Sequence, residues 1–314
     1  MTEAPQTTIP SVAPPSVHLS FVERYRISPI VFACVSLLAV FFFYQIVGGF
    51  LTLFFVGTKV TADTVTMHRI FTMGGQILFL LCPALILARL LDTKISRVFP
   101  WRKPNVGETI FAVLSLLFLQ EAMQIYMFFQ DRIPLPREIE KYVAPARQML
   151  EEMFRILVSA KDIPELLFVV LVVAITPAIV EELLFRGLIQ NCFERRLVPL
   201  RAAIWTGVIF GLFHFNPFQI VPLIILGCFF GILRMRSRSM IIAMTVHFLN
   251  NALAVVVTYF QMDDKMVIGA TKGNDINTAS LLAQMILFLM LFVVSFSSYL
   301  RLTSDIQTNE SHGP

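Results

Sequence analysis

Three small groups of polar residues interrupt otherwise apolar stretches in the second half of the chain, and their residue types could do chemistry. The groups are Glu181, Glu182 and Arg186; Phe210 and His214; and His247 and Asn251. An ionisable side chain at the centre of a membrane-spanning helix costs about 3 kcal/mol on insertion scales, so such residues are usually paired or functional. Their concentration here indicates a functional site.

Helical spacing predicts which of these side chains can meet. Glu182 and Arg186 are four residues apart and share one helix face, so we expect an ion pair between them. Glu181 is turned about 100° around the same helix and is free to face another group. His247 and Asn251 are also four residues apart and present an imidazole and an amide to the same space.

A carboxylate and an imidazole at one point can position and deprotonate a water molecule. A second imidazole and an amide nearby are suitable donors for a developing oxyanion. These are the groups that acyl hydrolysis requires. A serine or cysteine nucleophile fits less well, because no serine lies in a G-x-S-x-G turn and neither Cys192 nor Cys228 has a paired base at helical spacing.

Zinc is the competing chemistry, since Glu181, His214 and His247 could supply three ligands and leave one open position. However, the chain has no HExxH pair on one helix, and Asn251 and Arg186 suit an anion better than a cation. We therefore expect hydrolysis without a metal or other cofactor, with zinc as the less favoured alternative. A further alternative is that these polar groups only hold helices together.

The composition predicts the kind of element that must position these residues. Hydrophobic residues make up 56% of the chain and charged residues 15%, and the mean hydropathy is +0.74. Such a chain is an all-α integral membrane protein in contact with the lipid bilayer. The net charge of +4 does not indicate nucleic-acid binding, because the basic residues collect in short loops between apolar stretches. The four cysteines are expected to be small buried apolar residues.

Apolar stretches predict about eight transmembrane helices. They cover residues 29–57, 70–91, 106–130, 164–190, 202–215, 219–233, 240–260 and 281–300. The hydrophilic connection 131–163 contains apolar residues at spacings of three and four between 138 and 158, which indicates an amphipathic helix on the membrane surface.

The basic loops predict that both termini are cytoplasmic. Lysine and arginine gather in the loops that would then lie inside: Lys94, Arg97, Arg102 and Lys103; Arg195, Arg196 and Arg201; and Arg234, Arg236 and Arg238. Counted from the inner ends of their helices, Glu181, His214 and His247 are expected at depths of roughly 10–16 Å. All three would then share a cavity in the cytoplasmic half of the bilayer.

Four regions are expected along the chain. Residues 1–28 and 303–314 read as disordered tails, 29–163 as N-terminal transmembrane helices with the amphipathic connector, and 164–302 as the core that carries the site.

The three motifs, EExxxR, FxxxH and HxxxN in this order within successive membrane helices, resemble the CAAX protease and bacteriocin-processing family, which includes the type II CAAX prenyl endopeptidases. The resemblance covers about residues 164–259. It implies an eight-helix bundle in a bacterial plasma membrane, with an intramembrane cavity open to the cytoplasm. It also implies that Glu181 and His214 activate water, that His247 and Asn251 stabilise the oxyanion, and that Glu182, Arg186 and Phe210 support the site.

We therefore expect an intramembrane endopeptidase of the glutamate type that acts on a membrane-anchored peptide or protein, of CAAX or bacteriocin type. The alternative is a non-catalytic membrane protein that confers bacteriocin self-immunity or scaffolds a complex. A transporter fits less well, because the polar groups cluster at one site and do not line a path.

Overall fold

The computed structural model describes residues 18–262, 278–304 and 306. Regular structure in these ranges is helical, apart from one isolated bridge between Trp101 and Ser239. Among these described residues, seven helices are long and apolar enough to cross a membrane, and Pro199–Phe213 is a shorter apolar helix. The predicted all-α membrane fold is confirmed, with one of the eight expected spans too short to cross by itself.

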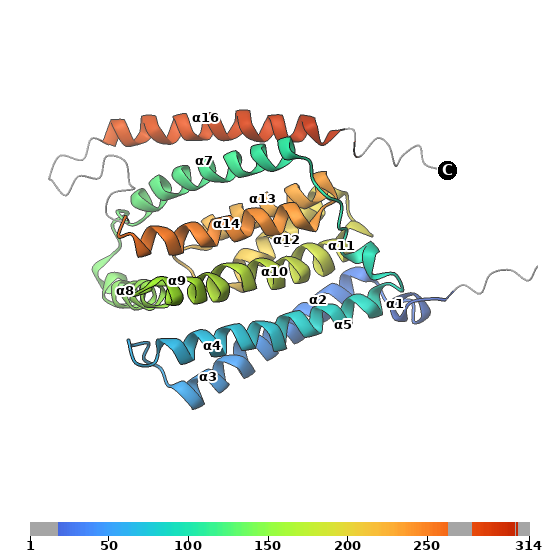
Figure 1. Ribbon diagram of the computed structural model, residues 1–314, viewed down its shortest axis with the longest axis horizontal. Helices are drawn as coiled ribbons and strands as arrows, with labels where there is room; N and C mark the ends of the chain where they lie inside the picture. Colours follow the sequence, from blue (N-terminus) through green and yellow to red (C-terminus); the bar gives the residue numbers. More distant parts are fainter. Residues whose placement is uncertain (1–17, 263–277, 305, 307–314) are drawn as a thin grey trace, which may run out of the picture.

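The first two spans pack as a pair on one side of the molecule (Figure 1). The first consists of α2 (Pro29–Phe41), the π-helical turn η1 (Phe42–Gly48) and α3 (Gly49–Val56); the second of α4 (Val65–Gln76), η2 (Ile77–Leu81) and α5 (Cys82–Leu91). Gly57 ends the first span with a φ of 93°, a conformation that only glycine adopts without strain.

A single long span forms the centre of the bundle. It runs through α9 (Ile163–Val169), η3 (Val170–Ile175), α10 (Thr176–Glu182), η4 (Leu183–Ile189) and α11 (Gln190–Glu194). Two of these stretches, η3 and η4, are π-helical. The π-helix is rare in proteins overall, and where it occurs it is often at a functional site. Nearly all of η4 is buried, so this span is packed by protein on most sides.

Two glycine pairs bring α12 (Pro199–Phe213) and α13 (Ile220–Ser237) into backbone contact. Gly207 and Gly211 lie four residues apart on α12, and Gly227 and Gly231 lie four apart on α13. A Cβ on Gly207 would lie 2.3 Å from the backbone nitrogen of Cys228, and one on Gly227 would lie 2.6 Å from the carbonyl oxygen of Gly207. This is the small-residue packing of membrane helices.

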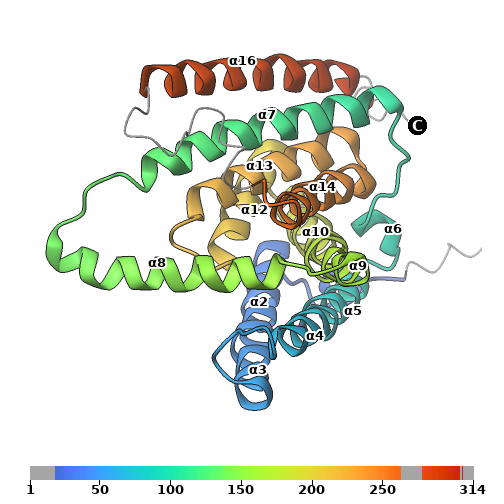
Figure 2. The same cartoon turned by 60° about the vertical axis from the view of Figure 1, so that its left-hand side comes forward.

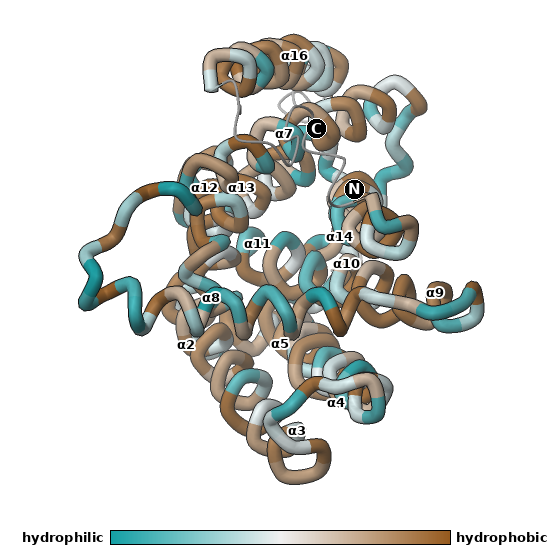
Figure 3. The backbone as a smooth tube through the Cα atoms, turned by 90° about the vertical axis from the view of Figure 1, so that its left-hand side faces the viewer, coloured by the Kyte–Doolittle hydropathy of each residue, from teal (hydrophilic) through white to brown (hydrophobic). Residues whose placement is uncertain are grey.

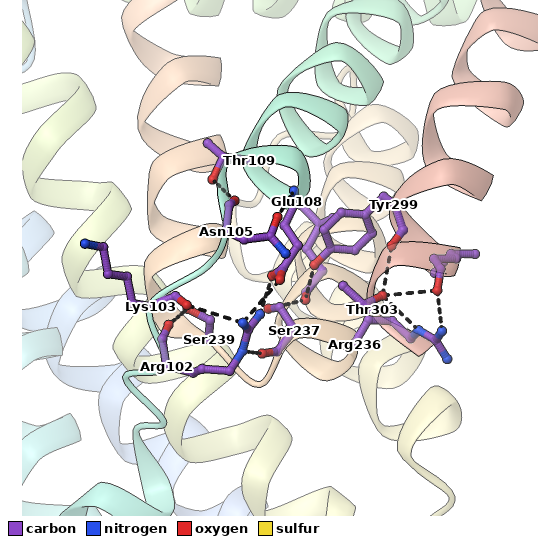
Figure 4. A network of polar contacts seen from close by, with 12 residues as sticks. Arg102, Lys103, Asn105, Glu108, Thr109, Arg236, Ser237, Ser239, Tyr299 and Thr303 are labelled. Atoms are coloured by element: carbon purple, nitrogen blue, oxygen red, sulfur yellow. Dashed lines mark hydrogen bonds and ion pairs between the residues drawn. The ribbon is translucent and has the colours of Figure 1, made fainter. Parts of the chain in front are cut away.

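The remaining spans are α7 (Val106–Gln130), α14 (Met240–Tyr259) and α16 (Thr278–Leu302), and α16 lies along the outer side of α7 (Figure 1). A polar network ties α7 and α16 to the C-terminal end of α13 (Figure 4). Arg102 pairs with the buried carboxylate of Glu108 and donates to the carbonyl of Ser237 over 2.5 Å. Tyr299 donates its hydroxyl to the carbonyl of Leu233 over 2.8 Å.

The predicted amphipathic helix is present as α8 (Arg137–Val158), which lies across one end of the bundle (Figures 2 and 3). The C-terminal end of α8 is bound by Arg69 on α4, a side chain that is 1% exposed. Its guanidinium donates to the carbonyls of Ile156, Leu157 and Ser159 and pairs with Glu165 at 2.6 Å. One buried cation therefore satisfies carbonyls that a helix end leaves unpaired.

Chain direction defines two faces of the bundle. The terminal face carries the described ends of the chain and the connections 92–105, 195–198 and 238–239; the α8 face carries 57–64, 131–162 and 214–219. The two faces lie at opposite ends of the long helices (Figure 1).

Several expectations need correction. Residues 18–28, placed in a tail, include α1 (Phe21–Arg24), where a capping box with Ser20 holds the pKa of the Glu23 carboxyl below its usual range. Thr303, also expected in a tail, is buried, and its hydroxyl donates to the carbonyl of Tyr299. The remaining expected tail residues, 1–17, 305 and 307–314, lie outside the described residues.

The expected burial of the cysteines holds for Cys192, whereas Cys34 and Cys82 are exposed on the outside of the bundle. The second span begins at Val65 rather than residue 70, so it also contains the buried His68 and Arg69. Sequence pattern alone favoured a later start, because these two residues are polar and the partners of Arg69 lie far away in the chain.

The glycine contact predicts a large difference between two alanine substitutions. Gly207→Ala must push α12 and α13 apart, since overpacking of this kind costs about 1–3 kcal/mol. Gly74→Ala is the control, because a Cβ there meets nothing within 4 Å. Thermal unfolding in detergent should show a clearly lower Tm for Gly207→Ala and an unchanged or higher Tm for Gly74→Ala. Equal Tm values would contradict the close packing.

Candidate active site

Glu182 lies at the centre of the polar cluster and is fully buried. Its Oε1 accepts hydrogen bonds from Nη1 of Arg186 at 2.9 Å and from Nδ1 of His247 at 2.8 Å. The bond to Arg186 is the ion pair that the four-residue spacing predicts. The bond to His247 joins the central span to α14, which spacing within one helix does not predict.

Arg186 is equally buried and is held on several sides. Its Nη2 donates to the carbonyl of Gly227 at 2.9 Å. The guanidinium lies 4.3 Å from the ring centre of Phe210 and 5.3 Å from that of Phe230. Aromatic faces stabilise a desolvated cation, so Arg186 is a fixed counter-charge that solvent does not reach.

His247 is oriented by its neighbours. Because the Glu182 carboxylate accepts from Nδ1, the proton is assigned to that nitrogen and Nε2 is the atom free for other partners. The ring stacks on Phe230 with centroids 5.0 Å apart and meets Phe210 edge-on at 6.0 Å. The two phenylalanines therefore set the plane of the imidazole.

Glu181 and His214 face each other from α10 and the C-terminal end of α12. Oε2 of Glu181 lies 3.7 Å from Nε2 of His214. Nδ1 of His214 lies 2.7 Å from the carbonyl of Phe210, which can only accept, so this nitrogen carries a proton and Nε2 faces the carboxylate. A separation of 3.7 Å exceeds a hydrogen bond and lets one water molecule contact both atoms.

Asn251 lies one helical turn beyond His247 and belongs to a chain of amides. Its Nδ2 donates to the carbonyl of Val173 at 3.0 Å, and its Oδ1 accepts from Asn250 at 3.0 Å. Asn250 in turn accepts from Gln120 on α7 at 3.0 Å. The amide of Asn251 is thus held in place from two helices.

A cavity of about 350 Å³ collects these residues on its wall. Glu181, Phe210, His214, His247 and Asn251 all line it, whereas Glu182 and Arg186 lie behind the wall. The other lining residues are mainly apolar or amides: Phe154, Val173, Asn216, Gln219, Pro222, Leu223, Leu226, Phe230, Asn250 and Ala254. Of the residues predicted to support the site, Glu182 and Arg186 thus lie behind the wall, whereas Phe210 is part of it.

Sequence reasoning missed Gly227, Phe230 and the amide partners Gln120 and Asn250. The glycine spacing of α13 was a usable signal, because two glycines four residues apart in a membrane helix indicate close helix contact. Phe230 carried no signal of its own among thirty phenylalanines, and its role depends on the contact between α13 and α14.

The fit of zinc to Glu181, His214 and His247 can be tested on the geometry. Each histidine donates from Nδ1 to an oxygen, which is also how zinc ligands are oriented. Among the described residues, however, no three histidine, cysteine, aspartate or glutamate side chains come together as a metal site.

These features define a multi-pass helical membrane protein with an acid, base and amide cluster inside its helices. Residues 163–253 match the family described as type II CAAX prenyl endopeptidase Rce1-like. The match confirms the resemblance to the CAAX protease and bacteriocin-processing family over this segment and supports a CAAX-type endopeptidase at the level of the family. Comparison with curated proteins and with solved structures finds no match.

The two adjacent carboxylates are expected to respond differently to the same substitution. Glu182→Gln leaves Arg186 as a buried cation without its counter-charge, a change that costs about 3–5 kcal/mol. Glu181→Gln breaks no ion pair with an arginine or lysine of the described part of the chain. Thermal unfolding in detergent should therefore show a much lower Tm for Glu182→Gln and a Tm close to that of the unsubstituted protein for Glu181→Gln.

A Glu182→Gln/Arg186→Met double variant extends this test. It removes both charges, so it should recover a large part of the lost Tm. A similar Tm for the two single variants, or no recovery in the double variant, would contradict the assignment of Glu182 and Arg186 as the supporting pair.

Proposed function

We propose that the chain is an intramembrane endopeptidase in which Glu181 and His214 activate a water molecule for attack on a peptide bond. The observation that carries this proposal is the 3.7 Å approach of Glu181 Oε2 and His214 Nε2 on the wall of one cavity. A water molecule between them can give a proton to either group as its oxygen attacks the carbonyl carbon. The proton then passes to the leaving amine.

His247 and Asn251 stabilise the negative charge that develops on the carbonyl oxygen. Protonated His247 donates from Nε2, with the Glu182 carboxylate balancing the charge on the ring. Asn251 donates from Nδ2, whose amide is already held by the carbonyl of Val173. Donors fixed before reaction are effective because they need no reorganisation as charge develops.

A membrane-anchored peptide or protein is the substrate that this site suits. The cavity wall combines apolar side chains with Asn216, Gln219 and Asn250, whose amides can bond to an extended peptide backbone. The name of the family that residues 163–253 match adds CAAX-type processing as one candidate reaction. The protein as a whole is proposed to work in a bacterial plasma membrane.

The proposal predicts that Glu181→Gln abolishes cleavage without unfolding the protein. Loss of a general base lowers kcat about 10²–10⁴-fold. Glu121→Gln is a matched control, because it removes a carboxylate from another span without changing the cavity wall. The measurement compares membrane peptides from cells that express the unsubstituted, Glu181→Gln and Glu121→Gln proteins, and then follows cleavage of the accumulated peptide by purified protein.

Unchanged cleavage by Glu181→Gln would contradict the assignment of Glu181 as the general base. A cellular phenotype that survives both Glu181→Gln and His214→Ala would instead favour the non-catalytic immunity or scaffold protein.

Hydrolysis by this pair needs no metal. We expect elemental analysis of the purified, active protein to find zinc well below one atom per chain. We also expect activity to survive about millimolar 1,10-phenanthroline, a chelator that removes zinc on which a protein depends. Loss of activity with the chelator, restored by added zinc, would contradict the metal-free assignment and favour the Glu181, His214 and His247 site.

A further inference from the structure

The cavity has a closed end and an open end. Phe210, Phe230 and His247 form the closed end and are at most 3% exposed. At the other end, Gln219 is exposed and Phe154, on α8, is 49% exposed. Because Phe154 lies on α8 and Gln219 lies in the connection between α12 and α13, the mouth opens toward the α8 face.

The short helices α12 and α13 explain this mouth. They have 15 and 18 residues, which correspond to about 22 and 27 Å, and both reach the terminal face. A hydrocarbon core is about 30 Å thick, so the connection 214–219 stops below the α8 surface. Irregular backbone at that depth is tolerated where it lines a water-filled cavity, so water enters from the α8 face.

The terminal face carries the basic connections. They include Lys94, Arg97, Lys103, Arg195, Arg196 and Arg238. Short loops rich in lysine and arginine stay in the cytoplasm. This face is therefore the cytoplasmic one.

The α8 face differs in its charges. The connection 57–64 holds one lysine and 214–219 holds none. The connection 131–162 holds six lysines and arginines, spread over 32 residues: Arg132, Arg137, Lys141, Arg147, Arg155 and Lys161. Among the described residues, the connections and chain ends of the terminal face carry nine lysines and arginines once Arg24, Arg26 and Arg102 are counted, against seven on the α8 face. Those of the terminal face also lie in shorter connections, which is where the rule applies most strongly.

We propose that the cavity opens to the extracytoplasmic side of the membrane, and that its substrate is a peptide presented at the outer leaflet. A cytoplasmic mouth and cytoplasmic termini, both expected from the sequence, cannot hold together, because the two features lie on opposite faces. The lining carries no lysine, arginine or aspartate, and Glu181 and the two histidines are its ionisable groups. The peptide segment that enters is therefore uncharged and largely apolar around the scissile bond. This substrate class rests on the proposed function.

Cysteine labelling tests the orientation without relying on activity. Tyr142→Cys and Gln219→Cys lie on the α8 face, and Val198→Cys lies on the terminal face; all three positions are exposed and uncharged, so the basic residues that set topology are untouched. The native cysteines lie within helices, and the unsubstituted chain gives the background. In intact cells a membrane-impermeant maleimide should label Tyr142→Cys and Gln219→Cys, and label Val198→Cys only after permeabilisation. The reverse pattern would overturn the proposal.

Sealed vesicles of known orientation test the substrate side. The probe is an uncharged, apolar fluorogenic peptide with an acyl anchor, added from outside. Cleavage is expected in right-side-out vesicles and not in inside-out vesicles, with Glu181→Gln inactive in both. Cleavage only in inside-out vesicles would overturn the orientation and leave the proposed function intact. No cleavage in either would count against the proposed function, and the labelling would still decide the orientation.

Discussion

The carboxylate of Glu182 accepts from Arg186 on its own helix and from His247 on α14, and the packing of the site depends on these two bonds. A carboxylate with no exposed surface is stable as an anion only if such partners are fixed around it. Arg186 in turn reaches the carbonyl of Gly227. One ionic cluster therefore holds the central span, α13 and α14 at set distances from one another.

Two consequences follow from that cluster. Glu181 directly precedes Glu182 in the chain and is turned away by about 100°, so it faces the cavity and makes no salt bridge with an arginine among the described residues. The backbone contact between Gly207 and Gly227 brings α12 against α13 and carries His214 to the same cavity. The proposed chemistry thus uses the carboxylate of Glu181, which is outside the ion pair. The glycine contact between α12 and α13 places the imidazole of His214 opposite it.

Much of this arrangement follows from sequence, and the rest depends on tertiary contacts. The pair of Glu182 and Arg186 is predictable because both residues lie on one helix. The bond between Glu182 and His247 joins residues 65 positions apart, and no helical period encodes it. The expected span 202–215 was displaced along the chain, since α12 begins earlier, at Pro199, and ends at Phe213 although hydropathy continues past that residue. The direction of the mouth could not be predicted, because it depends on where the hairpin of α12 and α13 stops.

The central claim is that Glu181 and His214 act together on one water molecule. A double-mutant cycle on kcat/KM measures this directly, using Glu181→Gln, His214→Ala and the double variant on one peptide. Groups that act as a unit give strongly non-additive losses, so the account predicts that the double variant is about as slow as the slower single variant. Losses that multiply, as for two independent residues, would contradict it.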